Sequence, residues 1–226
     1  METLAILRDT IREKPGFWLG ATAGFVALYY LCLLAAVVLR LGHLPNYATF
    51  YDWPANIWTI VRSTPSVRDM PPIIAREWLF ETGYMNMSYG HGIAEWSLAI
   101  VPAKVAVVAL LGALAATSLL LLRRLRATCP AALRGSAAAS TGVGALFVGV
   151  TNVTMTWVAC CSTPSWVAGL SLIGIETSSA YALLPYGNAL SLTGFAVLLA
   201  TNYILARRCL PPSQPAPSRR LAAQDL

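Results

Sequence analysis

The sequence has 226 residues, of which 57% are hydrophobic and only 12% are charged. Soluble domains carry about twice that share of charged residues, so the composition excludes an ordinary soluble domain and is typical of a helical membrane protein. The net charge of +6 does not indicate a nucleic-acid partner, because the basic residues lie beside apolar runs, where they determine membrane topology.

The apolar runs predict an all-α integral membrane protein with four transmembrane helices. In chain order the predicted segments are a cytoplasmic surface helix at 1–16, a first membrane helix at 17–41, a cap at 42–95, a second membrane helix at 96–122, a basic cytoplasmic loop at 123–136, a third membrane helix at 137–174, a fourth at 180–206 and a disordered cytoplasmic tail at 207–226. The cap is rich in aromatic residues, which favours a helical unit lying on the membrane face over a flexible linker. Within the cap we expect helices at 56–63 and 73–82.

The basic residues predict the orientation of these helices. Segments 1–16, 123–136 and 207–226 carry three, four and four Lys or Arg residues, and they share one side of the membrane if the chain crosses it four times. The cap is net acidic. The positive-inside rule therefore predicts a multi-pass protein of the bacterial inner membrane, with both termini in the cytoplasm and the cap in the periplasm.

A vicinal cysteine pair, Cys160-Cys161, lies in the outer half of the third predicted membrane helix, with Pro164 three residues further on. Two adjacent thiolates offer a soft metal ion near-linear coordination, and the proline interrupts the backbone ladder so that the helix can open. The alternative is that both cysteines pack as small hydrophobic residues. The pair lacks the two intervening residues of thioredoxin-like redox centres, which argues against thiol oxidoreduction.

Several short motifs surround this pair. In chain order they are Gly144-Ala-Leu-Phe147, Ala159-Cys-Cys-x-x-Pro164, Gly169-Leu-x-x-x-Gly174, Ser179-Ala180 and Leu184-Pro-Tyr186, the last before an apolar helix that ends in Arg-Arg. Positions 144–208 therefore resemble the mercuric-ion transport family of mercury-resistance operons, whose first helical hairpin carries a Cys-Cys-x-x-Pro helix. The resemblance implies that Cys160 and Cys161 receive a soft metal ion from the periplasmic side. The amino-terminal half of the chain shows no such resemblance.

The chain departs from that family in three respects. Leu184 stands where the family has an acidic residue, and two predicted spans and the cap precede a hairpin that comes first in the family. The family's cytoplasmic cysteine pair is missing, and only the isolated Cys129 and Cys209 lie on the predicted cytoplasmic side. These departures leave two interpretations, an inward relay to those two cysteines or a hairpin reused for another purpose.

A second candidate metal site lies in the cap at Met85-Asn-Met87-Ser-Tyr-Gly-His91. Thioether and imidazole ligands suit Cu(I), and the Met-x-Met spacing can bring both sulfurs to one ion. His43, at the other end of the cap, is a candidate further ligand. The alternative is that the methionines fill the membrane interface and that His91 is an ordinary turn residue.

Two charged residues are candidates for intramembrane charges, Lys104 in the second predicted span and Glu176 near the end of the third. A lysine about two turns inside a membrane helix either extends to the surface or pairs with a carboxylate. Glu95 and Glu176 are the candidate partners.

These features leave two hypotheses. The first is soft-metal handling or transport of copper or mercury by Cys160 and Cys161, with Met85, Met87 and His91 as an outer collection point and a periplasmic metal carrier as partner. The second is a non-catalytic membrane subunit or assembly factor of a larger respiratory or oxygenase complex, with the aromatic cap as its docking surface. We do not expect an enzyme, because no catalytic motif accompanies the thiols.

Overall fold

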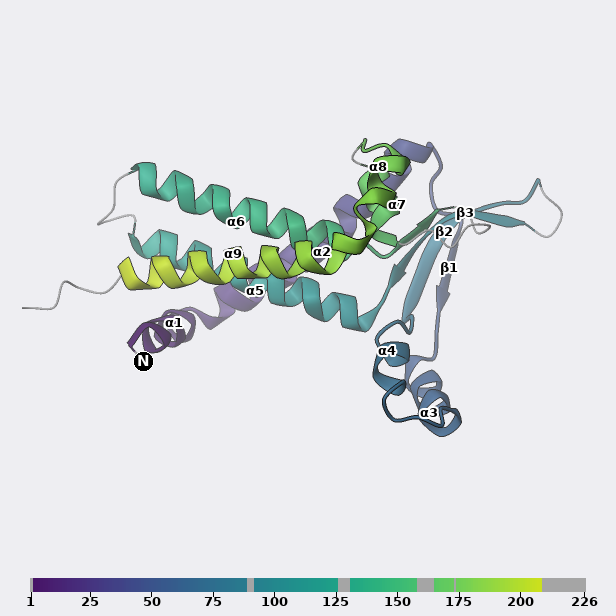
Figure 1. Cartoon of the computed structure of the whole chain (residues 1–226), viewed down its shortest axis with the longest axis horizontal. Coiled ribbons are helices and arrows are strands. Elements are labelled where there is room, and N and C mark those ends of the chain that lie inside the picture. The colour runs from purple at the N-terminus through teal and green to yellow at the C-terminus, as the bar shows by residue number, and fades with distance from the viewer. Residues whose placement is uncertain (1, 89–91, 126–130, 158–164, 173, 209–226) are drawn as a thin grey trace, which may run out of the picture.

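The computed structural model of the chain describes residues 2–88, 92–125, 131–157, 165–172 and 174–208. The described chain is mostly helical and forms two regions, a bundle of long helices and a four-stranded sheet at one end of that bundle (Figure 1). We call these the bundle and the sheet region, and the sheet region includes two short helices, α3 and α4.

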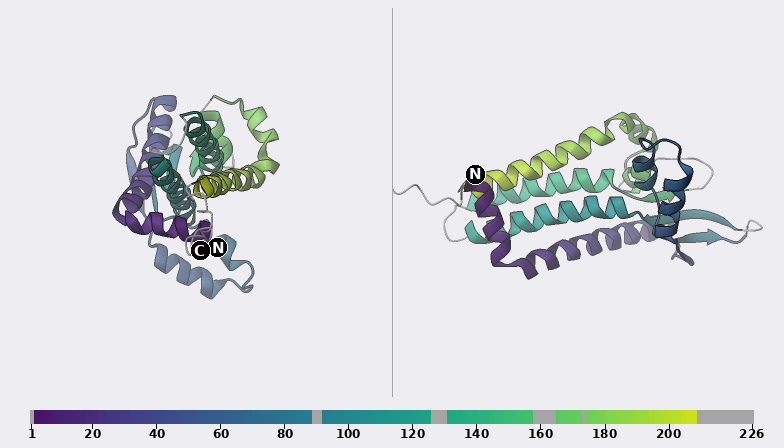
Figure 2. Two further views of the ribbon diagram at one scale, coloured as in Figure 1. Left: turned by 90° about the vertical axis from the view of Figure 1, so that its left-hand side faces the viewer. Right: turned by 90° about the horizontal axis from the view of Figure 1, so that it is seen from below.

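Four long helices lie side by side in the bundle (Figures 1 and 2). They are α2 (Pro15–Leu41), α5 (Pro102–Leu125), α6 (Ala131–Thr151) and α9 (Gly187–Arg208). The shorter α1 (Glu2–Glu13) lies across the end of the bundle opposite the sheet. Arg124 of α5 holds α1 there, because its guanidinium donates to Thr10 Oγ1 at 3.0 Å and lies 3.5 Å from Glu13 Oε2.

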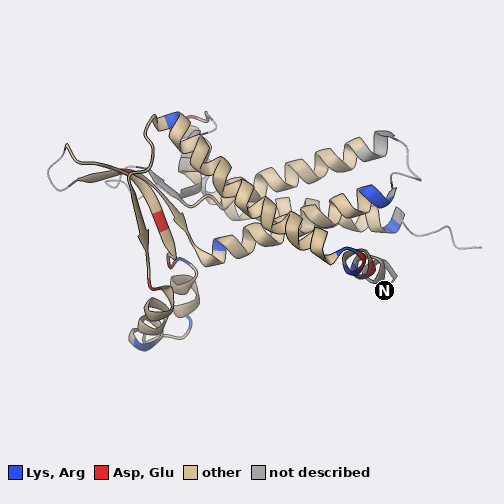
Figure 3. Ribbon diagram, turned by 180° about the vertical axis from the view of Figure 1, so that it is seen from behind, with Lys and Arg blue, Asp and Glu red and all other residues tan. Residues whose placement is uncertain are grey.

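Three of the described helices are long and apolar enough to cross a membrane, as expected of an integral membrane protein: Pro15–Leu41, Pro102–Arg124 and Gly187–Arg207. The fourth bundle helix, α6, contributes a shorter apolar stretch, Gly135–Thr151. Arg123, Arg124 and Arg207 close α5 and α9 at the end of the bundle away from the sheet (Figure 3).

The closest helix packing in the bundle is between α6 and α9. A β-carbon at Gly144 would lie 2.9 Å from the carbonyl oxygen of Gly194, and one at Gly194 would lie 2.8 Å from the carbonyl oxygen of Gly144. The two glycines therefore let the backbones touch, as small residues do between membrane helices. Val148 and Leu198 are fully buried beside them with Leu111 of α5.

The sheet consists of β1 (Tyr47–Phe50), β2 (Phe80–Asn86), β3 (Ile93–Ile100) and β4 (Met155–Trp157), in that order and antiparallel throughout. β3 leads directly into α5, and β4 follows α6 after a short polar segment. The sheet is joined to the bundle by one apolar cluster, in which Trp96 and Leu98 of β3 pack with Val37 of α2 and Val153.

The sheet corrects the prediction of an all-α chain with a purely helical cap. α3 (Trp53–Ser63) begins three residues before the predicted helix at 56–63, with Asp52 Oδ1 accepting from the Ala55 backbone N–H at 3.2 Å. The predicted helix at 73–82 is wrong, because α4 (Met70–Ile74) ends at its start and β2 follows. β2 is a strand because β1 and β3 supply its hydrogen-bond partners on both sides, and no local pattern reveals that pairing.

The membrane helix predicted to begin at position 96 begins at Pro102 instead. The residues before it form β3, in which four consecutive residues from Trp96 to Ala99 are buried. A short apolar run that is buried on both faces has the same sequence signature in a strand and in a helix, which is why the periodicity misassigned it. Pro102 then occupies a helix start, where a missing N–H costs nothing.

The third predicted membrane helix, 137–174, ends at Thr151 in the structure. The polar residues that follow turn the chain into β4 by bonding to backbone carbonyls: Asn152 Nδ2 donates to Val148 at 2.8 Å, and the Thr154 hydroxyl donates to Ala99 of β3. After β4 the described elements are α7 (Ser165–Leu172), α8 (Thr177–Ala182) and a 3-10 turn, η1 (Leu184–Tyr186), which precedes α9.

Candidate functional site

The predicted site residues fall into three groups. Cys160, Cys161, Pro164 and His91 lie outside the described residues. Met85 and Met87 lie at the far end of the β2–β3 hairpin, and Lys104 lies in the first turn of α5. Glu176 is exposed just before α8, with its carbonyl oxygen accepting the Ala180 N–H.

The methionine pair converges on Gly92, the residue before β3. A β-carbon placed on Gly92 would meet Met85 Sδ at 2.9 Å and Met87 Sδ at 3.0 Å, so the two sulfurs lie within about 6 Å of each other. Gly92 has a backbone φ of 87°, a conformation that residues other than glycine rarely adopt. The backbone conformation therefore favours glycine at this position, and a β-carbon there would displace one or both thioethers.

The backbone of the hairpin is fixed by side-chain hydrogen bonds around Met85. Asn46 brackets this residue, because its Nδ2 donates to the Met85 carbonyl at 2.8 Å and its Oδ1 accepts from the Met85 N–H at 2.7 Å. Asn86 Nδ2 donates to Glu95 Oε1 at 2.6 Å across the hairpin. Met85 is half-buried in the hairpin, whereas Met87 is 66% exposed.

The other predicted ligand in this region, His43, stacks on Tyr84 with ring centroids 4.4 Å apart and ring planes 8° apart. Tyr84 precedes Met85 at an irregularity in the β2–β3 pairing. The stacking places His43 beside the hairpin. Across the described parts of the chain, no three or more His, Cys, Asp or Glu side chains gather as a metal site would require.

The cysteine pair follows directly from β4. In the β3–β4 pairing Trp157 lies opposite Trp96 and Met155 lies opposite Leu98, so β4 runs toward the end of β3 where the methionine pair lies. Cys160 and Cys161 follow Trp157 by three and four residues.

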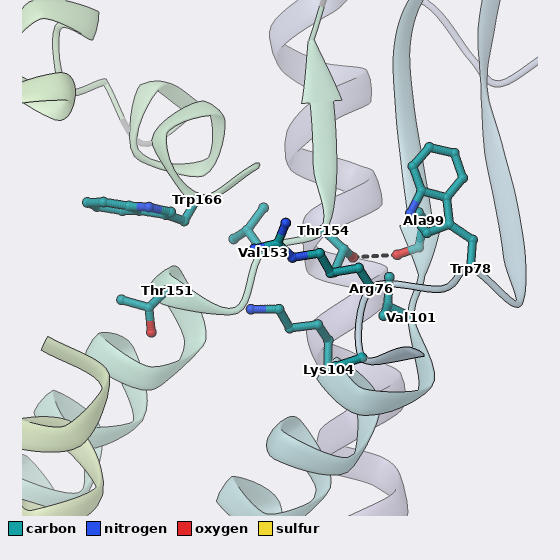
Figure 4. Close-up of a pocket in the computed structure, with 10 residues that line it drawn as sticks. Arg76, Trp78, Ala99, Val101, Lys104, Thr151, Val153, Thr154 and Trp166 are labelled. Carbon is teal, nitrogen blue, oxygen red and sulfur yellow. Dashed lines mark hydrogen bonds between the residues drawn. The ribbon is translucent and has the colours of Figure 1, made fainter. Parts of the chain in front are cut away.

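A cavity of about 520 Å³ lies where the sheet meets the bundle (Figure 4). Arg76 and Lys104 point into it, and Trp78 and Trp166 form part of its walls. The predicted partners of Lys104 lie elsewhere: Glu95 bonds Asn86 toward the hairpin end of β3, and Glu176 is exposed. Lys104 Nζ instead donates to Asn152 Oδ1 at 3.4 Å. No sequence pattern predicts this cavity, because its walls come from four separate parts of the chain.

A cluster of two tyrosines and one carboxylate lies at the β1–β2 side of the sheet, away from β4. Tyr47 and Tyr51 donate to the two oxygens of Glu81, at 3.0 and 2.7 Å. Burial, together with the hydrogen bond to Glu81, raises the pKa of Tyr47 to about 12. The hydrogen bond to Glu81 is the main cause that raises the pKa of Tyr51 to about 12. Both phenols are therefore neutral donors at physiological pH and act as structural links between β1 and β2.

Comparison of the chain with protein-family models, with curated proteins and with solved structures found no match. The resemblance of positions 144–208 to the mercuric-ion transport family thus rests on its motif residues. The chemical interpretation of the site depends on the geometry of the hairpin, of β4 and of the cavity.

Proposed function

We propose that this protein binds and hands over a soft metal ion, copper or mercury, at the sheet end of a membrane-embedded bundle. Cys160 and Cys161 are the principal ligands, and Met85 and Met87, with His91, form the outer collection point. The observation that carries the proposal is the convergence of the two methionine sulfurs over Gly92. The two sulfurs lie within about 6 Å of each other, so small side-chain movements bring both onto a single ion.

The ligand types give the transfer a direction. Thioethers are neutral and hold Cu(I) loosely, whereas thiolates are negatively charged and bind soft ions more tightly. An ion therefore moves favourably from the methionines to the cysteines. Each cysteine that binds as a thiolate releases its proton, so binding is weaker at low pH.

The chain length between the two ligand pairs permits such a handover. Met85 lies opposite Ala94 and Trp157 lies opposite Trp96, so their positions are about 7 Å apart along β3 and two strand spacings, or about 10 Å, apart across the sheet. Three residues connect Trp157 to Cys160, and an extended chain of that length covers up to about 10 Å of the resulting separation of about 12 Å. The methionine and cysteine side chains are long enough to cover the remainder.

We place the protein in the bacterial inner membrane with four spans, α6 being the third, and with both termini in the cytoplasm. The arginines that close α5 and α9 lie at the end of the bundle opposite the sheet, which supports this orientation under the positive-inside rule. The sheet region then faces the periplasm, where a metal carrier reaches the exposed Met87.

Metal titration of the purified full chain tests the proposal. Wild-type protein binds Cu(I) or Hg(II) in competition with a chelator, and Cys160→Ser/Cys161→Ser loses tight binding. Met85→Leu/Met87→Leu keeps tight binding but loads more slowly from a donor chelator. Cys32→Ser, at an exposed thiol of α2, and Met70→Leu, in α4, are the matched controls and leave both quantities unchanged. Undiminished affinity in the double cysteine variant contradicts the proposal.

A second candidate function is a non-catalytic subunit or assembly factor of a larger membrane complex. It is favoured by large apolar side chains that are exposed in the sheet region, outside the candidate spans: Leu44, Phe50, Trp58 and Val67 are 58–81% exposed. Such surface commonly marks a protein interface. Under this hypothesis Phe50→Ser/Trp58→Gln reduces the size of the complex extracted from native membranes, and the cysteine variants leave that size unchanged.

A further inference from the structure

The cavity at the junction of sheet and bundle brings two cationic side chains together. Arg76, after α4, and Lys104, in the first turn of α5, both point into it (Figure 4). An adjoining hollow of about 280 Å³ shares Lys104, Thr151 and Trp166 and extends to the first turn of α9. The two hollows adjoin each other at these three shared residues.

The described walls of both hollows contain two cations and no carboxylate. Arg76 and Lys104 are close enough for their positive charges to repel each other. Neither forms an ion pair within the described chain, where the recorded pairs are Arg8–Asp9 and Arg124–Glu13. Asp69 and Glu77 line another hollow that shares Arg76, where Glu77 accepts from Asn56 Nδ2 at 2.7 Å and neither carboxylate forms an ion pair with Arg76. Two like charges held together without a counterion favour an anion between them.

The helix ends around the cavity reinforce this charge. α5 begins at Pro102 and α9 begins at Gly187, and the first turn of α9 lines the smaller hollow through Gly187, Asn188 and Ser191. The amino-terminal ends of helices carry partial positive charge and unpaired N–H groups.

α6 brings its carboxyl-terminal end to the same place, but side chains cap its last carbonyls. Thr151 Oγ1 donates to Phe147, Asn152 Nδ2 donates to Val148, and the Tyr29 hydroxyl donates to Gly149 at 2.8 Å. The negative end of α6 is thereby partly offset, and the positive groups dominate the site.

We propose that this junction cavity binds a phosphate-bearing anion, and that its source is the headgroup of an anionic phospholipid. The cations provide charge-assisted hydrogen bonds to phosphate oxygens, and the adjacent apolar walls, Val101, Val153 and Trp166, accept the glycerol and upper acyl carbons. Lys104 lies at the start of the candidate span Pro102–Arg124, which is the depth at which lipid phosphates lie. A soluble phosphate ester has the same anionic group but gains nothing from these apolar walls.

The proposed anion site is independent of the metal site. The methionine pair lies at the Ile93 end of β3 and the cavity lies at its Ile100 end, about 23 Å apart along an eight-residue strand. A bound headgroup contacts the α4 end of the sheet region and the ends of α5 and α9. The anion therefore fastens the sheet region to the bundle at a point where their own contacts leave a cavity.

Lipid binding to the purified full chain tests this proposal, with native mass spectrometry in detergent as the readout. Phosphatidylglycerol binds wild-type protein more tightly than phosphatidylcholine of the same chain length. Arg76→Gln and Lys104→Gln each weaken phosphatidylglycerol binding by roughly tenfold or more, the loss expected for one charge-assisted contact. Lys104→Arg retains most of the affinity. Arg62→Gln is the matched control, because Arg62 is an exposed arginine that stacks on Trp58 away from the cavity.

A second measurement separates binding from folding and identifies the source of the anion. The midpoint of thermal unfolding without added lipid is similar in wild type and Arg76→Gln, and only wild type gains stability on adding phosphatidylglycerol. If glycerol 1-phosphate binds as tightly as the lipid, the cavity is an anion site but its ligand is a soluble phosphate ester. Equal binding of the two lipids, or unchanged phosphatidylglycerol binding in both Gln variants, overturns the proposal.

Discussion

The bundle and the sheet region satisfy their polar groups in different ways. In the bundle, hydroxyl side chains return to a carbonyl one turn earlier, as Thr117, Thr141 and Thr201 do at 2.8 Å. In the sheet region, polar side chains connect segments far apart in the sequence, as the bonds from Tyr47 and Tyr51 to Glu81 show. Long-range side-chain bonds also occur in the bundle, from Trp18 Nε1 to Thr117 Oγ1 at 3.0 Å and from Ser118 to Asn202 at 3.2 Å.

This difference indicates where chemistry can be placed in such a molecule. Within lipid, every backbone and side-chain polar group must find a partner in the protein, so helices that face lipid have few groups to spare for a ligand. The sheet region is under no such constraint. The convergent thioethers lie at its far end, and the unpaired cations lie where it meets the bundle.

The largest effect is expected for overpacking the α6–α9 contact of the bundle. Gly144→Val drives a side chain into the Gly194 carbonyl and Leu198, which destabilises the bundle by about 1–3 kcal/mol. Gly142→Val is the control on the same helix, because a β-carbon there meets nothing within 4 Å. The free energy of unfolding of both variants is measured by titrating the protein from a mild into a harsh detergent. Equal stability of the two variants contradicts the packing described here.

The next effect concerns Gly92 and separates metal binding from backbone strain. In Gly92→Ala the left-handed φ costs roughly 1–2 kcal/mol, so we expect a lower free energy of unfolding. The added methyl group also lies between the two sulfurs, so we expect slower Cu(I) loading. Gly42→Ala is the control, because it introduces a similar backbone strain at a φ of 76° but has nothing within 4 Å of its β-carbon. Only the Gly92 variant changes the loading rate. A matching change in Gly42→Ala assigns the effect to stability rather than to the sulfurs.

A smaller effect is expected for a hydrogen bond to the backbone at the junction of the sheet region and the bundle. Thr154 donates its hydroxyl to the Ala99 carbonyl, and the Ala99 N–H donates to the Thr154 carbonyl at 2.9 Å. Thr154→Val keeps the shape and the second bond but loses the first, which costs about 1 kcal/mol of unfolding free energy. Thr59→Val removes an exposed hydroxyl that bonds within α3 and serves as the comparison. Thermal unfolding that treats the two variants alike argues against a stabilising role for the junction bond.

The smallest effect is a dependence on alkaline pH that arises in the sheet region. Tyr47 and Tyr51 have pKa values raised from 10.0 to about 12. The unfolded chain releases these protons near pH 10 while the folded chain keeps them, so their contribution to stability is complete below pH 10 and is lost as the pH rises toward 12. Glu81→Gln lowers both pKa values and flattens this decline, as measured by phenolate absorbance and thermal unfolding. A phenolate titration unchanged by Glu81→Gln shows that the carboxylate does not control these groups.

The bundle was predictable because its signals are local. A long apolar run followed by arginine identifies α5 and α9, and Pro15 and Gly42 mark the ends of α2. The sheet was not predictable for the opposite reason. β4 pairs with β3 across more than fifty positions of sequence, and the apolar end of β3 runs into the helix that follows it with no polar residue between them.

The candidate sites show the same contrast. Met85 and Met87 were singled out in the sequence because a Met-x-Met spacing can bring two thioethers to one ion, a signal that does not depend on the fold. The contribution of Gly92 was missed, because the need for a glycine there depends on a turn and on two side chains packed above it. Arg76, Lys104 and Trp166 come together only through the fold, and no spacing between them points to a common cavity.

X-ray absorption at the copper edge, on the purified full chain loaded with one equivalent of Cu(I), tests the metal-binding proposal most directly. The proposal predicts a first shell made of sulfur, which loses scatterers in Cys160→Ser/Cys161→Ser and is unchanged in Cys32→Ser. A shell of nitrogen and oxygen alone, or a sulfur shell that survives loss of both cysteines, contradicts it.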